Sequence, residues 1–270
     1  MSKKVLINVA PVAATCRHID PQAIAADVLE CRRQGAAMVH LHVRDEHGAL
    51  TPDTKLLEET LKLIREQSDI IIEVSTGGVS DLTIAERCAP IPLPLVEACS
   101  LNVGSTNLGD AVYVNRPADV EYCVQELLKY HKIPEVETFE IGHTHTTLQL
   151  MEKFPMQRPV LFSVVLGHRG AAPATMQALD LMVQMLPDDS SKVLWGITHS
   201  GRKNWDIIGA ALDRGAKTVR VGFEDSNYVD ENTTTTNNYD LVAKAVKVMA
   251  EHDCEPMTPE EARKLLHIGY

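Results

Sequence analysis

The stretch VHLHVRD, residues 39–45, places two histidines in a segment that otherwise has the composition of a buried strand. With the residues before it, the segment reads AAMVHLHV, an apolar and β-branched run typical of a strand covered on both faces. Side chains two residues apart on a strand point to the same face, so His40 and His42 project together. A single such histidine is most often a hydrogen-bonded core residue, but two that converge from the end of one strand predict half of a metal site.

Further strand-like runs follow along the chain, and helical patterns separate them. The runs lie at 4–10, 37–43, 70–75, 97–102, 136–141, 160–166, 192–197 and 217–223. Helices are predicted between Asp20 and Gly35, from Thr51 through Ile64, at 80–88, 116–130, 144–153, 173–186, 203–213 and 238–251, and from Thr258 onward. Strands that alternate with helices over about 250 residues match the size of a (β/α)8 TIM barrel, and we predict one such domain over residues 1–270. A doubly wound open sheet is the alternative fold.

Two of the predicted helices carry clear boundary signals. Asp20 stands before Pro21 as an N-cap, and Gly35 marks the end of the same helix. Thr258 and Glu261 have the spacing of a capping box, which predicts a last helix after the eighth strand.

The composition limits the classes of partner and compartment. The net charge of −11 argues against nucleic acid or an anionic membrane as the main partner. The chain has no run of 18 apolar residues, and its first residues lack the apolar segment of a signal peptide, so we expect a cytoplasmic protein. The six cysteines, at 16, 31, 88, 99, 123 and 254, contain no C-x-x-C pair and are predicted to be reduced, mostly buried thiols.

Polar residues gather at the ends of the predicted strands, where a barrel places its functional groups. They include STGG (75–78) after the third strand, SLNVGS (100–105) at the fourth, Glu137 on the fifth, and VRVGFED (219–225) at the eighth. Glu224 can complete a set with His40 and His42, because strands eight, one and two are close neighbours in a closed barrel. Two histidines and one carboxylate leave coordination positions open, as at a catalytic zinc, and would also suit non-haem iron(II). Arg220 faces the barrel interior in this pattern and therefore needs an anion, either Asp225 or a substrate carboxylate.

With HLHVRD, STGG, SLNVGS, PEVE and RVGFED on five of these strands, the chain resembles the β-keto acid cleavage enzymes. These are zinc-dependent (β/α)8 proteins that include the 3-keto-5-aminohexanoate cleavage enzyme. The similarity runs in order through essentially the whole chain and also covers VLGHRGAAPAT and GAKTVRVGFEDSNY. The pairing of HLHVRD with RVGFED at the far end is its specific part.

The resemblance implies an acyl transfer in which a β-keto acid and acetyl-CoA give acetoacetate and a new acyl-CoA. It implies that His40, His42 and Glu224 bind Zn²⁺, that Asp225 is the base or its relay, and that Arg220 orients Asp225. It places substrate contacts at Thr15, Ser75, Gly78, Asn102, Ser105 and Glu137. It also implies a homotetramer.

The end of the first strand departs from the aminohexanoate-cleaving pattern. That pattern carries an acidic residue there to meet the ammonium group of the substrate, whereas VAPVAATCRH offers Thr15 and no acid. A cation in a water-poor pocket needs a charge partner. We therefore expect a substrate tail without an ammonium group, and an inward Arg17 or a protonated His18 would favour a carboxylate tail.

The main rival is a metal-dependent barrel hydrolase that acts on an amide or ester. Histidines after strands five, six and seven (His143 or His145, His168 and His199), together with Asp225, superficially fit that class. Against it, the H-x-H pair lies on the second strand, and no lysine near strand four is available to bridge two metals. A purely structural or ligand-binding barrel would not explain so many ionisable groups at strand ends.

Overall fold

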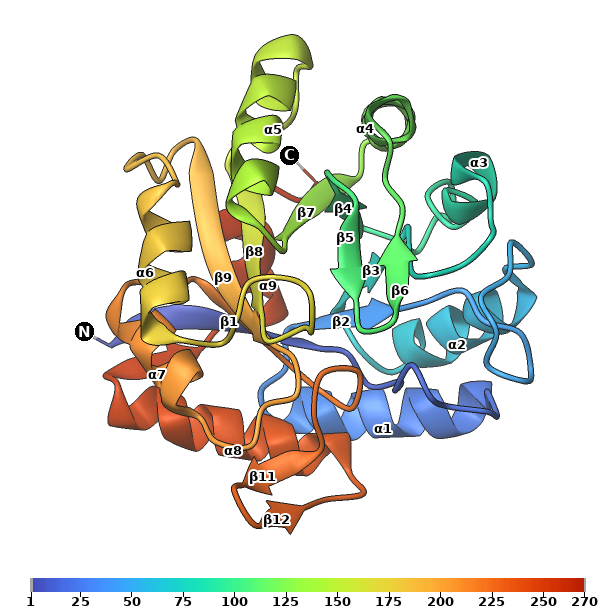
Figure 1. Ribbon diagram of the computed structural model, residues 1–270. Helices are drawn as coiled ribbons and strands as arrows, with labels where there is room; N and C mark the ends of the chain where they lie inside the picture. The colour runs from blue at the N-terminus through green and yellow to red at the C-terminus, as the bar shows by residue number, and fades with distance from the viewer. Residues whose placement is uncertain (1, 270) are drawn as a thin grey trace.

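Eight parallel strands close into a barrel in the computed structural model, which describes residues 2–269 (Figure 1). The barrel strands are β1 (Lys3–Val9), β2 (Met38–Leu41), β3 (Ile71–Val74), β4 (Ala98–Asn102), β7 (Ile133–Thr138), β8 (Val160–Leu166), β9 (Val193–His199) and β10 (Thr218–Val221). Each strand pairs with the next in the chain, and β10 pairs with β1 to close the sheet. The predicted (β/α)8 barrel is confirmed, and the open-sheet alternative is wrong.

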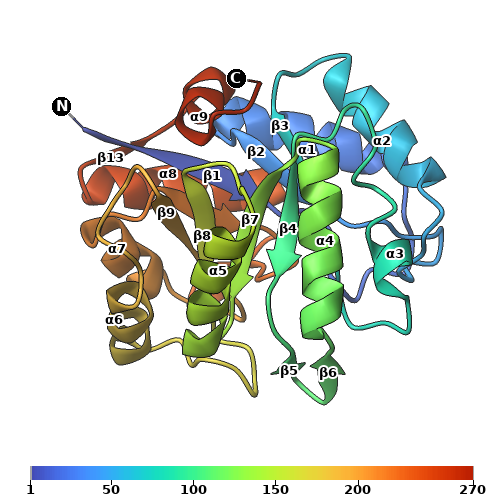
Figure 2. The same cartoon turned by 90° about the horizontal axis from the view of Figure 1, so that it is seen from above.

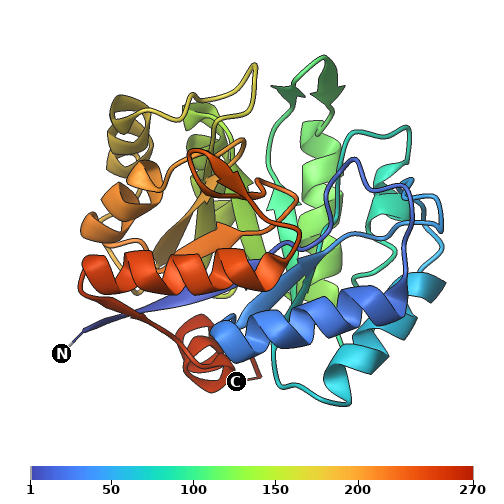
Figure 3. The same cartoon turned by 90° about the horizontal axis from the view of Figure 1, so that it is seen from below.

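Helices surround the barrel and connect its strands. They are α1 (Pro21–Gln34), α2 (Lys55–Arg65), α3 (Ile84–Arg87), α4 (Pro117–Lys129), α5 (Ile141–Lys153), α6 (Met176–Gln184), α7 (Asp206–Asp213), α8 (Asn238–Glu251) and α9 (Pro259–Leu266). The predicted caps are present: Asp20 accepts from the backbone of Gln22, and Gly35 adopts a left-handed conformation. Figure 3 shows α1 and α8 side by side along one face of the barrel.

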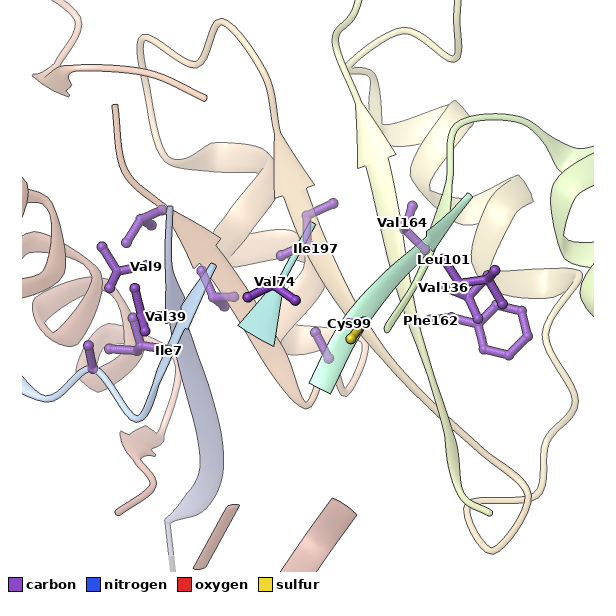
Figure 4. Packing of buried hydrophobic residues seen from close by; sticks show 14 of the residues in the cluster. Ile7, Val9, Val39, Val74, Cys99, Leu101, Val136, Phe162, Val164 and Ile197 are labelled. Carbon is purple, nitrogen blue, oxygen red and sulfur yellow. The ribbon is translucent and has the colours of Figure 1, made fainter. Parts of the chain in front are cut away.

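The main core lies between the strands and the surrounding helices. Alternate strand residues point outward and pack against helix side chains, as the labelled residues in Figure 4 show: Ile7, Val9, Val39, Val74, Cys99, Leu101, Val136, Phe162, Val164 and Ile197. All ten are buried. Because this apolar shell lies outside the sheet, the interior of the barrel can accommodate polar side chains.

The interior changes from apolar to polar along the barrel axis. At the N-terminal ends of the strands, Leu6, Met38, Ile71, Ala98, Ile133, Leu161 and Leu194 form a small apolar layer that α9 closes with Ala262 and Leu266. Two residues further along the strands lie Asn8, His40, Glu73, Ser100, Glu135 and Ser163, a buried set that we call the polar column. The C-terminal ends of the strands therefore adjoin a layer of buried polar side chains inside the barrel.

Several elements differ from the sequence-based expectation. The fifth barrel strand covers 133–138 instead of 136–141, because Pro134 lies within the strand near its start, where the loss of an N–H is tolerated. Helix α5 begins at Ile141, earlier than predicted, and α3 is a single turn. Residues Thr233–Thr234 of the predicted polar loop form β12, which pairs with β11 (Tyr228–Asp230).

A hairpin of β5 (Thr106–Leu108) and β6 (Ala111–Tyr113) was not predicted and follows β4. Figure 2 shows it projecting beyond the end of β4, at the opposite end of the barrel from α9. A short strand, β13 (Cys254–Pro256), pairs with β1 outside the barrel and leads into α9.

All six cysteines are free thiols, and five of them are buried, as predicted. Among residues 2–269, no helix has the length and apolar character needed to cross a membrane.

The position of α9 predicts how much it stabilises the barrel. Leu266 is 1% exposed beneath the apolar layer, so Leu266→Ala should lower the free energy of unfolding by about 2–5 kcal/mol. The matched control is Leu181→Ala on α6, where the leucine is 48% exposed and the change should stay within about 0.5 kcal/mol. Urea unfolding monitored by circular dichroism measures both. Equal effects of the two substitutions would show that α9 does not close the core.

Candidate active site

His40, His42 and Glu224 come together at the C-terminal end of the barrel and form the ligand cluster. Their potential ligand atoms lie within 4.8 Å of one another. The Nε2 atom of His42 is 3.2 Å from Oε1 of Glu224, and the Nε2 atom of His40 is 4.0 Å from the same oxygen. Both imidazoles thus present Nε2 toward one carboxylate, as the i, i+2 spacing predicted, although His42 lies just beyond the end of β2.

Two contacts place Glu224 next to these histidines. Gly222 has a φ of 138°, and a Cβ at this position would lie 2.2 Å from the carbonyl oxygen of Ala10, so a glycine lets the chain after β10 approach β1 closely. Asn238, the first residue of α8, accepts a hydrogen bond from the backbone N–H of Phe223 through its side chain. The turn that carries Glu224 is therefore fixed from both sides.

Arg220 links the ligand cluster to two further carboxylates. It binds Asp225 through two hydrogen bonds of 3.0 Å, which satisfy both carboxylate oxygens. It also donates to Oε1 of Glu224 and to Oε1 of Glu137, each at 2.8 Å. The amide of Asn102 donates to the other oxygen of Glu137 at 2.8 Å. Arg220, Asp225, Glu137 and Asn102, four residues singled out in the sequence, thus form one network with the ligand cluster.

The charges of this network are unbalanced without a further cation. Burial lowers the pKa of Arg220, but Asp225, Glu224 and Glu137 raise it well above its ordinary value, so the guanidinium stays charged. Burial raises the pKa of Glu224, yet the charges of His42 and Arg220 lower it well below its usual range. With the carboxylates ionised and both imidazoles neutral, as in metal ligands, three carboxylates around one guanidinium leave a net negative charge in the site. Together with two imidazole nitrogens, this donor set fits a divalent cation such as Zn²⁺.

Asp225 is the carboxylate of this network that is best suited to exchange a proton. Burial raises its pKa more than the charge of Arg220 lowers it. A carboxylate with a raised pKa is a better proton acceptor than an ordinary aspartate. The two hydrogen bonds from Arg220 fix its position beside the ligand cluster.

The remaining predicted substrate residues are only partly in this network. Ser75 is buried, and its Oγ accepts from the backbone N–H of Gly77 at 3.2 Å. Gly78 has a φ of 135° and packs against Leu50. Ser105 is exposed, and its Oγ accepts from the backbone of Asn115 at the base of the β5–β6 hairpin. Thr15 is exposed on the loop after β1. The substrate contacts of all four stay predictions.

The STGG segment packs against the unpredicted hairpin. A Cβ at Gly77 would overlap the hydroxyl of Tyr113, which lies 1.4 Å from that position. Arg87 donates to this hydroxyl at 2.9 Å and to the Thr76 carbonyl, also at 2.9 Å. At least one glycine of STGG therefore serves the packing of a tyrosine.

Sequence reasoning missed three functional candidates in the polar column: Asn8, Glu73 and Glu135. Glu73 Oε2 lies 3.2 Å from Nδ1 of His40. The amide of Asn8 donates to Glu73 at 2.7 Å and to Glu135 at 3.1 Å. Burial raises the pKa of Glu73 to about 7 and raises that of Glu135 well above its usual value. The available signal was an acid at an inward position of an apolar strand, in IIEV and again in IPEVET.

The histidines of the hydrolase alternative do not form a second cluster. His143 is buried, and its Nδ1 accepts from the backbone N–H of Phe139, while His145 is exposed on α5. Burial lowers the pKa of His168, and that of His199 to about 4. Within residues 2–269, His40, His42 and Glu224 are the one group of three or more such side chains with metal-binding geometry. His168 lies within electrostatic reach of Asp225 and Arg220, so it belongs to the surroundings of the same site.

A (β/α)8 barrel with this ligand cluster and an adjoining Arg–Asp pair defines a class, the barrel enzymes with a single metal-binding site at the C-terminal end of the strands. Residues 4–268 match the model of the beta-keto acid cleavage enzyme family, and the chain belongs to this family.

Relatives of known activity and solved structures agree with this assignment. The chain is 32% identical over 249 residues to the 3-keto-5-aminohexanoate cleavage enzyme of Fusobacterium nucleatum, covering 92% of this chain and 89% of the relative. It is 30% identical to the 3-dehydrocarnitine:acetyl-CoA trimethylamine transferase of Rhizobium meliloti, covering 93% and 89%. A structure titled as a ternary complex of ObcA with C4-CoA adduct and oxalate shares the fold with a TM-score of 0.81 at 18% identity, covering 93% of this chain and 67% of ObcA.

The ligand cluster predicts the metal content of the protein. Purified wild-type protein reconstituted with Zn²⁺ and then desalted should retain a single ion per chain, and His42→Ala should retain almost none, because one of the three ligand atoms is lost. His145→Ala, which removes an exposed histidine, is the control and should behave as wild type. Inductively coupled plasma mass spectrometry gives the stoichiometry. Two ions per chain would contradict the single site and favour the hydrolase class.

Proposed function

We propose that the chain is a zinc-dependent β-keto acid cleavage enzyme that converts a β-keto acid and acetyl-CoA into acetoacetate and a new acyl-CoA. The observation that carries the proposal is the position of Asp225, which Arg220 holds beside the ligand cluster. Family membership supports this reaction class. Two relatives support it as well, because their names describe a trimethylamine transferase and an acetyltransferase that use acetyl-CoA. By the same resemblance, we propose a single-domain, homotetrameric and cytoplasmic enzyme.

The proposed chemistry conserves atoms and electrons. A proton leaves the α-carbon of the β-keto acid, and the resulting enolate carbon forms a bond to the carbonyl carbon of acetyl-CoA with loss of CoA thiolate. The thiolate then attacks the original keto carbon of the substrate. The bond between that carbon and the α-carbon breaks, which releases the new acyl-CoA and, after the α-carbon regains a proton, acetoacetate.

The residues of this chain have separate parts in that sequence. Asp225 accepts the proton of the α-carbon and returns it at the end, and Arg220 keeps both carboxylate oxygens of Asp225 in place through its paired hydrogen bonds. Glu137 and Asn102 fix the far side of Arg220. A zinc ion held by His40, His42 and Glu224 would polarise the keto group and stabilise the negative charge of the enolate. His40, Arg220 and Asp225 are buried, which limits the access of water to the reacting carbon.

We further propose that the substrate has a tail without an ammonium group. Thr15 offers only a neutral hydroxyl after β1. The one acid of this loop, Asp20, accepts from the backbone at the start of α1 as its N-cap, so no free carboxylate of the loop can pair with an ammonium group. Because Arg17 faces solvent, a neutral, short or aliphatic tail is favoured over a carboxylate tail. The relatives named above differ in the tails of their substrates, as does the 3-oxoadipate:acetyl-CoA acetyltransferase of Cupriavidus necator, which is 27% identical over 98% of this chain and 95% of its own length.

The role of Asp225 predicts a variant that separates chemistry from metal binding. Asp225→Asn should lower kcat by about 10²–10⁴-fold, because the amide cannot accept the proton, while the zinc content stays that of wild type. The control is Asp188→Asn, at an exposed position away from the site, which should keep wild-type kcat. Steady-state assays of CoA ester formation measure both. Near-wild-type turnover of Asp225→Asn would refute the assignment, and product formation without acetyl-CoA would refute the transferase class.

The loop after β1 predicts a substrate preference. The value of kcat/KM should be higher for neutral β-keto acids than for 3-keto-5-aminohexanoate of similar length, because the ammonium group finds no charge partner near Thr15. A tenfold preference for the amino substrate, about 1.4 kcal/mol of transition-state binding, would contradict this expectation. In that event another acid, such as Glu137, would have to hold the amine.

A further inference from the structure

The centre of the barrel holds acidic side chains for which the proposed reaction has no direct use. Glu73 and Glu135 are 0% and 4% exposed, and both lie below the ligand cluster in the polar column. Burial of a carboxyl group is unfavourable unless it gains compensating contacts. Glu73 interrupts the otherwise apolar strand β3, so its presence requires a specific partner.

The contacts of His40 identify that partner. Nδ1 of His40 lies 3.2 Å from Oε2 of Glu73, while Nε2, on the other side of the ring, faces Glu224 at 4.0 Å. The ring of His40 therefore stands between the two carboxylates, and Glu73 contacts the nitrogen that faces away from the ligand cluster. The Nδ1 atoms of both histidines lack a hydrogen bond of full geometry among the described residues. They differ because Nδ1 of His40 lies at ion-pair distance from Glu73, whereas the ion-pair contact of His42 is made by its Nε2.

Glu73 is itself held in place from across the barrel. The amide of Asn8 on β1 donates to Oε2 of Glu73 at 2.7 Å and to Oε2 of Glu135 on β7 at 3.1 Å. A single side chain thus ties three strands together directly beneath His40. This arrangement restricts the position of the Glu73 carboxylate as well as that of the imidazole.

We infer that Glu73, supported by Asn8 and Glu135, is the positioning residue for His40: it holds the proton on Nδ1 and directs the Nε2 lone pair toward the metal. The inference rests on the metal centre in the proposed function. A carboxylate partner on the second ring nitrogen fixes the tautomer and orientation of a ligand histidine and raises its basicity. Among the described residues, no carboxylate contacts Nδ1 of His42, so His40 is the ligand whose orientation a carboxylate sets.

The first test measures metal affinity, without recourse to catalysis. In Glu73→Gln, the amide can donate to Nδ1 and favour the tautomer whose proton blocks Nε2, so the dissociation constant for Zn²⁺ should rise about 10–100-fold. Competition with a chromophoric chelator measures it. The matched control is Glu152→Gln, which changes an exposed glutamate on α5 and should alter the constant by less than about threefold.

The second test determines the tautomer of His40 directly. Two-bond ¹H–¹⁵N correlation spectra of wild-type protein with ¹⁵N-labelled histidine should show His40 as the Nδ1–H tautomer both before and after zinc is added; His40→Gln identifies its signals. In Glu73→Gln the zinc-free spectrum should shift toward the Nε2–H tautomer.

The outcomes separate this inference from the proposed function. If wild-type protein binds Zn²⁺ but His40 is not the Nδ1–H tautomer, or Glu73→Gln binds zinc as tightly as wild type, the role of Glu73 is refuted and the proposed function stands. If wild-type protein binds no divalent metal, both are refuted. Equal losses in Glu73→Gln and Glu152→Gln would show that the effect is not specific to the contact with His40 and would also refute the inference.

Discussion

The guanidinium of Arg220 is the interaction on which the site depends. It bridges Glu137 on β7, Glu224 and Asp225 on the turn after β10, and through Glu137 it reaches Asn102 on β4. Removing this cation would leave three neighbouring carboxylates buried together, which is unfavourable by several kcal/mol. Arg220 therefore orients the proposed base and one proposed metal ligand at the same time. The three carboxylates that it holds together give the neighbouring ligand cluster a donor set suited to a divalent cation.

The fold separates stability from chemistry. Apolar packing between the strands and the surrounding helices forms the main core, and α9 closes the N-terminal end of the barrel. Toward the C-terminal ends of the strands, the barrel interior contains the polar column, whose hydrogen bonds connect different strands. This division lets the protein place acids and histidines at fixed positions without weakening the outer shell.

The fold and the ligand cluster could be predicted because both depend on local periodicity. Alternation of strand and helix patterns gave the barrel, and the two-residue repeat gave the common direction of His40 and His42. Glu73 and Glu135 were missed although each is an acid at an inward position of an otherwise apolar strand. Asn8 could not be recognised, because it joins β1 to β3 and β7, which do not follow β1 in the chain. The hairpin of β5 and β6 was also missed; Ser105, which the resemblance implies as a substrate contact, accepts from the backbone N–H of Asn115 at the base of this hairpin. The substrate tail stays open because Thr15 lies on an exposed loop whose contacts depend on the bound molecule.

The most direct test of the proposed reaction follows a labelled carbon. The enzyme is incubated with an unlabelled neutral β-keto acid and acetyl-CoA that carries ¹³C at its carbonyl carbon, and the products are examined by ¹³C NMR and mass spectrometry. Enolate attack followed by cleavage predicts the label at the keto carbon of acetoacetate, with an unlabelled new acyl-CoA. Label in free acetate, or an unlabelled acetoacetate, would contradict the carbon–carbon bond formation on which the proposed function rests.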